Sequence, residues 1–169
     1  MKNCVSFLYV LVLIALVSCQ TEKKAEPVDK DAVKTEVANF MDELYSVFTT
    51  KNFDLYANRL CDDGLFVGTD RTEFMDKSAL IEAQKSMFDD PEFVFTYKLT
   101  KRVVRVANDG KSALVIDQFE DTPVFGPDMP VRLTSQVIKT ENGWKVDYMG
   151  WGLIPDNEDL GKIAAALAE

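Results

Sequence analysis

The chain has 169 residues, with 28 acidic and 19 basic side chains, three cysteines and no histidine. This length suits one domain with a single core, and the formal net charge of −9 argues against nonspecific nucleic-acid binding, which depends on clustered Lys and Arg. Without histidine, the usual zinc sites and every mechanism that uses an imidazole base are excluded, so we expect neither a metal nor a cofactor.

The N-terminus has the pattern of a secretory signal. Lys2 precedes an apolar run over residues 5–17, which matches the apolar region of a signal peptide and is shorter than the ~20 residues that a spanning helix needs. The run ends at Leu16-Val17-Ser18-Cys19, which resembles the lipobox of bacterial lipoproteins. An ordinary signal peptide and an uncleaved membrane anchor are the alternatives.

The lipobox resemblance implies that residues 1–18 are removed and that Cys19 carries the lipid. The expected product is an envelope protein held to a membrane by its acyl chains. Gln20 stands where inner-membrane lipoproteins of enteric bacteria often carry aspartate, so the outer membrane is favoured over the inner one. Residues 19–30 then form the lipidated cysteine and a flexible, charged tether.

Helical spacing begins at the next segment. Apolar residues recur every three or four positions from Val33 to Phe48, which predicts an amphipathic helix of about 18 residues with Asp29 or Asp31 as its cap. A short helix over 53–60 and a brief strand over 64–70 follow. Asp76 or Ser78 is expected to open a third helix, and Pro91 comes after its end.

The second half has the pattern of β-structure. Strands are predicted over 93–106, 113–120, 131–140 and 144–152, with turns at 108–110 and 142–143 and a loop over 122–130. An acidic tail, 155–169, ends in a short helix over 163–167. The order predicts an α+β fold in which a curved antiparallel sheet wraps around N-terminal helices.

Two motifs carry a resemblance to a known family. The segment Phe66-Val67-Gly68-Thr69-Asp70, with Glu73 and Lys77 after it, is similar to the motif after the first strand of SnoaL-like proteins, which belong to the nuclear transport factor 2-like superfamily. The segment 141–146 (ENGWKV) is similar to the last hairpin of that family. The resemblance implies a cone-shaped domain over 31–154 with a pocket between helices and sheet.

The same resemblance implies a range of activities, from isomerisation and dehydration to plain binding. In the nearest branches the last strand carries two histidines after the Trp-Lys-Val segment, and here those positions hold Tyr148 and Gly150. This departure favours binding over catalysis. Members of the family often pair through the sheet, so a homodimer is a further expectation.

The hairpin turn gives an expected register for the last two strands. If residues 142–143 form a two-residue loop, Glu141 pairs with Trp144, and Arg132, Gln136 and Asp147 share one side of the sheet with Met149 and Trp151. The candidate pocket combines polar and apolar side chains: Phe66, Tyr97, Asp117, Phe119, Arg132, Gln136, Asp147, Met149 and Trp151.

Three classes of function remain open on this pattern. The first, which we favour, is a lipid-anchored module that binds a small apolar or amphipathic molecule. The second is an enzyme with Asp117 or Asp147 as general base and Tyr97, Tyr148 or Arg132 as electrophilic partner. The third is a dimeric interaction module. Cys61 lacks an activating histidine, so we expect it to be a packing residue.

Overall fold

The computed structural model describes residues 27–122 and 129–168. The predicted signal peptide, Cys19, most of the tether and much of the 122–130 loop lie outside the described residues. No helix within the described ranges is long and apolar enough to cross a membrane.

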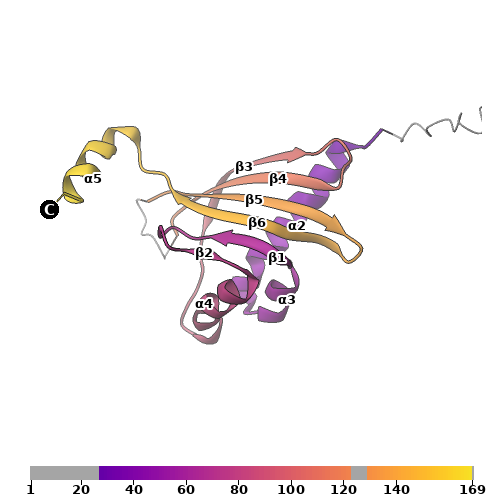
Figure 1. Ribbon diagram of the computed structural model, residues 1–169, viewed down its shortest axis with the longest axis horizontal. Helices are drawn as coiled ribbons and strands as arrows, with labels where there is room; N and C mark the ends of the chain where they lie inside the picture. The colour runs from indigo at the N-terminus through magenta and orange to yellow at the C-terminus, as the bar shows by residue number, and fades with distance from the viewer. Residues whose placement is uncertain (1–26, 123–128, 169) are drawn as a thin grey trace, which may run out of the picture.

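Three helices cover the inner face of the sheet (Figure 1). Helix α2 spans Lys30–Thr50, α3 spans Phe53–Asn58 and α4 spans Lys77–Asp89. Side-chain caps fix where the helices begin: Asp29 caps α2, Asn52 caps α3 and Asp76 caps α4, because each side-chain oxygen accepts from a free backbone N–H of the first turn. Helix α3 is two residues shorter than predicted, because Leu60 already belongs to the first strand.

Six strands form one sheet in the order β2-β1-β6-β5-β4-β3. Their bounds are β1 Leu60–Val67, β2 Phe74–Met75, β3 Lys98–Val106, β4 Ser112–Glu120, β5 Val131–Thr140 and β6 Gly143–Leu153. The four long strands β3–β6 pair antiparallel, as predicted. The two-residue strand β2 is not evident from the sequence, and β3 begins five residues later than predicted.

The antiparallel prediction needs one correction, because β1 pairs with β6 in parallel. The chain enters the sheet after α3, and β1 lies between β2 and β6, with the Val146 amide donating to the Arg59 carbonyl at 2.8 Å. The sheet is therefore mixed.

The register predicted for the β5–β6 hairpin is wrong. Thr140 pairs with Gly143, so the loop residues are Glu141 and Asn142, and a bulge then shifts the pairing between Val137↔Val146 and Gln136↔Tyr148. Gly143 has φ +95°, a conformation that glycine adopts without a steric cost. As a result Trp144, Val146 and Met149 are all buried on the inner face.

The core lies between α2 and the sheet. Helix α2 buries Val37, Met41 and Leu44, and each of the long strands β4 and β5 alternates buried with more accessible residues. The chain ends in a short 3-10 turn, η1 (Asn157–Asp159), and helix α5 (Leu160–Ala166). Helix α5 buries no residue and stands away from the domain (Figure 1).

Candidate functional site

An apolar cavity of about 280 Å³ lies between the helices and the inner face of the sheet. The helices contribute Leu44, Tyr45, Phe48, Tyr56, Leu80, Ala83, Gln84 and Met87. The strands and connecting segments contribute Phe66, Val67, Gly68, Thr69, Glu73, Met75, Phe95, Phe119, Thr122, Met149 and Trp151. Glu73 is the one carboxylate among these described lining residues, and none of them is Lys or Arg.

Four of the residues predicted from the sequence line this cavity: Phe66, Phe119, Met149 and Trp151. Tyr97 lies next to it, with its ring 5.4 Å from that of Phe119 and 5.7 Å from that of Tyr45. The cavity is therefore aromatic on the side of the sheet.

Other predicted residues lie elsewhere. Arg132 and Gln136 are exposed because the inner face of β5 carries Val131, Leu133, Ser135 and Val137. Tyr148 pairs with Gln136 and lies on the same outer face. Asp147 sits in the bulge of β6 and is not a lining residue.

The sequence did not indicate the lining residues of α3 and α4. Tyr56 and Gln84 are polar residues within helices, and spacing alone does not separate a helix face that meets a cavity from one that meets a packed core. Two hydrogen bonds to Asp70 hold Glu73 at the cavity. The Glu73 carboxylate accepts from the Asp70 amide at 3.0 Å, and the Glu73 amide donates to the Asp70 carbonyl at 3.1 Å.

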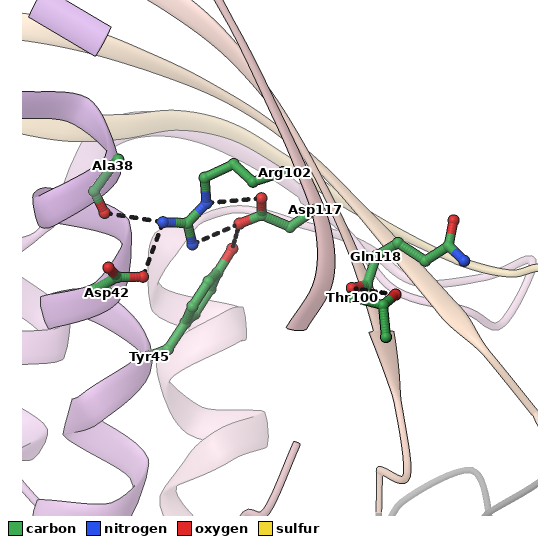
Figure 2. Close-up of polar contacts among 7 residues, drawn as sticks. All are labelled: Ala38, Asp42, Tyr45, Thr100, Arg102, Asp117 and Gln118. Carbon is green, nitrogen blue, oxygen red and sulfur yellow. Dashed lines mark hydrogen bonds and ion pairs between the residues drawn. The ribbon is translucent and has the colours of Figure 1, made fainter. Parts of the chain in front are cut away.

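Asp117 is not a lining residue of the cavity. It forms a buried ion pair with Arg102 beside the cavity (Figure 2). The carboxyl group is 0% exposed and accepts from Arg102 Nε at 2.8 Å and Arg102 Nη2 at 2.9 Å. Its second oxygen also accepts from the Tyr45 hydroxyl at 2.7 Å. Arg102 further donates to the Ala38 carbonyl and to Asp42 of α2, so the cluster joins α2 to β3 and β4.

Burial governs the electrostatics of this cluster. It raises the pKa of the Tyr45 hydroxyl well above its ordinary value, and the charge of Asp117 adds to the rise. For Arg102, burial acts to lower the pKa, but the hydrogen bonds and charges of Asp117 and Asp42 outweigh it and raise the pKa overall. The Tyr45 hydroxyl thus donates its hydrogen bond to Asp117, while Tyr45 also lines the cavity.

A second group of ligating atoms lies at the facing bulges of β1 and β6. Cys61, Asp63 and Asp147 place one ligand atom each within 4.8 Å of one another. Burial raises the pKa of the Cys61 thiol, and the charges of Asp147 and Asp63 add to the rise. Asp63 is exposed. Cys61 itself is 5% exposed and free, as expected of a packing residue.

Three polar atoms in the cavity wall have no hydrogen-bond partner among the described residues. They are the Tyr56 hydroxyl, Gln84 Oε1 and Thr122 Oγ1. A buried polar atom without a partner is destabilising. The cavity therefore offers hydrogen-bonding capacity in an otherwise apolar wall.

Comparison with known proteins identifies one matching domain family. The model of the SnoaL-like domain family matches residues 37–150. No curated protein matches the chain.

Several solved structures share the architecture. A nuclear transport factor 2-like protein of unknown function from Pseudomonas putida KT2440 is 16% identical, with a TM-score of 0.63 over 76% of this chain and 91% of that one. One from Cytophaga hutchinsonii is 17% identical, with a TM-score of 0.58 over 75% and 99%. A ketosteroid isomerase-like protein from Erwinia carotovora atroseptica is 17% identical, with a TM-score of 0.54 over 72% and 96%. At these identities the likeness shows the cone fold, which agrees with the fold class predicted from the sequence.

Proposed function

Because the chain belongs to the SnoaL-like domain family, we propose that it is a lipid-anchored protein that binds a small apolar or amphipathic molecule in the cavity. The observation that carries the proposal is the cavity itself, which has aromatic and aliphatic walls and few polar groups. Sites of this composition bind small molecules mainly by burying their apolar surface.

The positions of Asp117 and Asp147, the two bases predicted from the sequence, favour binding over acid–base catalysis by either of them. A general base needs a free oxygen within reach of the substrate. Both oxygens of Asp117 accept from Arg102, and one of them accepts from Tyr45 as well. Asp147 lies outside the cavity wall, so neither predicted base faces the space where a substrate would lie.

The anchoring part of the proposal rests on the sequence. The apolar run over 5–17 and the segment Leu16-Val17-Ser18-Cys19 support lipidation at Cys19 and attachment to a bacterial envelope membrane, with the outer membrane favoured. Two or more acyl chains hold a protein stably at a membrane.

Obstructing the cavity tests the binding proposal. Ala83 lines it from α4 and is itself exposed, so Ala83→Trp adds an indole at the open side of the cavity, where it obstructs entry of a ligand. We expect N-phenyl-1-naphthylamine, a neutral fluorescent probe, to bind the full chain saturably at one site. The Ala83→Trp variant should bind it about tenfold more weakly or worse.

Ala164→Trp on the exposed helix α5 is the matched control and should leave probe binding unchanged. Circular dichroism and thermal unfolding show whether each variant is folded. No saturable binding to the wild-type chain, or equal binding by a folded Ala83→Trp variant, would refute the cavity as the binding site.

A further inference from the structure

We propose that the bound molecule carries a neutral hydroxyl group, and that Tyr56 and Gln84 recognise it together at the α3–α4 side of the cavity. This inference rests on the proposed binding function and specifies the chemistry of its ligand. The observation behind it is that both side chains line the cavity with polar atoms that have no partner among the described residues.

The position of the Tyr56 hydroxyl is set by packing. Tyr56 is 1% exposed, and its ring lies 5.3 Å from that of Phe48 and 5.5 Å from that of Phe88. Phe48 and Phe88 are themselves 5.1 Å apart, so the three rings form one packed cluster that restrains the Tyr56 ring. The hydroxyl is therefore held at the cavity wall before any ligand arrives.

Gln84 lies beside this hydroxyl. Burial raises the pKa of Tyr56 above its ordinary value, and hydrogen bonding with the Gln84 side chain opposes part of the rise, so the amide lies within reach of the hydroxyl. Even so, no hydrogen bond of acceptable geometry joins the two side chains, and both the Tyr56 hydroxyl and Gln84 Oε1 lack a partner within the described ranges.

The two free atoms have complementary roles. A tyrosine hydroxyl donates a proton, and the amide oxygen of glutamine only accepts. An alcohol or phenol both accepts and donates, so one ligand hydroxyl satisfies the pair. A carbonyl oxygen could accept from Tyr56 but would leave Gln84 Oε1 unpaired.

The charges around the cavity select against an anion. The described lining residues include no Lys or Arg, and their one carboxylate, Glu73, already accepts from the Asp70 amide. A carboxylate ligand would lose its hydration without gaining a cation. A neutral polar group loses less hydration free energy than a carboxylate when it enters the cavity.

Displacement of N-phenyl-1-naphthylamine from the full chain at pH 7 tests the proposal with three competitors of similar size: 2-naphthol, 2-methylnaphthalene and 2-naphthoate. A hydroxyl replaces a methyl group between the first two, so their ratio isolates the hydrogen bonds. We expect 2-naphthol to compete about tenfold better than 2-methylnaphthalene, and 2-naphthoate to compete least.

Tyr56→Phe and Gln84→Met remove one partner each while keeping the shape of the side chain. Each should reduce the preference for 2-naphthol to about twofold or less and leave the affinity for 2-methylnaphthalene unchanged. Tyr148→Phe and Gln118→Met, which lie outside the cavity wall, are matched controls and should keep the full preference.

Each alternative outcome is informative. Equal competition by 2-naphthol and 2-methylnaphthalene in the wild-type chain would mean that a water molecule, or a direct hydrogen bond from Tyr56 to Gln84, satisfies the pair, and would refute this inference while leaving the binding function intact. Retention of the preference in folded Tyr56→Phe and Gln84→Met variants would refute it too, as would tightest binding by 2-naphthoate. If no compound bound at all, the proposed function would fail as well.

Discussion

Asp117 is a charged residue in a place where charges are costly. Its carboxylate is fully buried, and the guanidinium of Arg102 compensates it through two hydrogen bonds. A buried pair of this kind contributes little compared with an apolar replacement of both partners, but removal of one partner leaves an uncompensated charge. The contribution of Asp117 to the fold is therefore best measured by single substitution.

We expect Asp117→Asn to lower the free energy of unfolding by about 3 kcal/mol, the lower end of the range for a broken buried pair, because Asp42 still faces Arg102. Urea denaturation monitored by circular dichroism gives the value. Asp147→Asn, in the partly exposed bulge, is the control and should change stability by about 0.5 kcal/mol or less. If the Asp117→Asn variant were as stable as the wild type but no longer bound the cavity probe, Asp117 would have a role in ligand binding and not in stability.

At the scale of the elements, the facing irregularities of β1 and β6 decide which side chains reach the cavity. Pairing between these strands is interrupted from Leu60↔Val146 to Leu65↔Tyr148. Gly64 lies inside this interruption, and a Cβ atom there would meet Phe66 Cζ at 2.8 Å and the Asp147 carbonyl oxygen at 3.0 Å. A side chain at this position would therefore crowd both the Phe66 ring and the β6 backbone.

We therefore expect Gly64→Ala to destabilise the protein by about 1–3 kcal/mol, because the added methyl group would have to displace both the Phe66 ring and the β6 backbone. Gly152→Ala is a matched control in the same sheet, since a Cβ atom at that position meets nothing within 4 Å. Thermal unfolding of the two variants compares them directly. Equal melting temperatures would contradict the close approach.

Elements with regular spacing were predictable from the sequence, and the bulge in β6 was not. Periodicity located α2, α4 and the four long strands, because each keeps one spacing over many residues. The register of the last hairpin was not predictable from its turn, since the apolar positions of β6 change parity between Val146 and Met149, three residues apart. This spacing was the one available signal of the bulge. Arg132 and Gln136, predicted to line the pocket, lie on the outer face because the true register differs from the predicted one.

The helical wall of the cavity was unpredictable for a different reason. Its residues obey the same spacing as packed core, and their meeting with Phe119 and Trp151 depends on long-range contacts. Tyr56 and Gln84 become recognisable only because their polar atoms have no partner once the surrounding residues are in place.

At the scale of the whole molecule, attachment and binding are assigned to separate parts of the chain. If Cys19 carries the lipid, Cys19→Ser should leave the unprocessed precursor without acyl chains. Metabolic labelling with a radioactive fatty acid, followed by immunoprecipitation, measures this. Cys61→Ser, a change at a buried position, is the control and should label normally. Labelling of the Cys19→Ser variant would contradict the lipobox assignment.

The outer face of the sheet is a further feature at this scale. Among the described residues, helices α2, α3 and α4 cover the inner face (Figure 1), and Val103 is 38% exposed on the other side. The homodimer expected from the family resemblance stays a prediction, which sedimentation at micromolar concentration would test.

The course of α2 also has a consequence for how a ligand would arrive. Lys30 donates to Asn108 at 2.8 Å, so the chain enters the domain beside the β3–β4 turn. The first cavity residue on α2, Leu44, lies about 20 Å further along the helix axis. In a protein held from its N-terminal side, the membrane-proximal end would carry this turn and the cavity would sit at the far end. The tether and the ligand would then meet the domain at opposite ends of α2, so a change in the length of the predicted tether should leave the cavity itself unaltered.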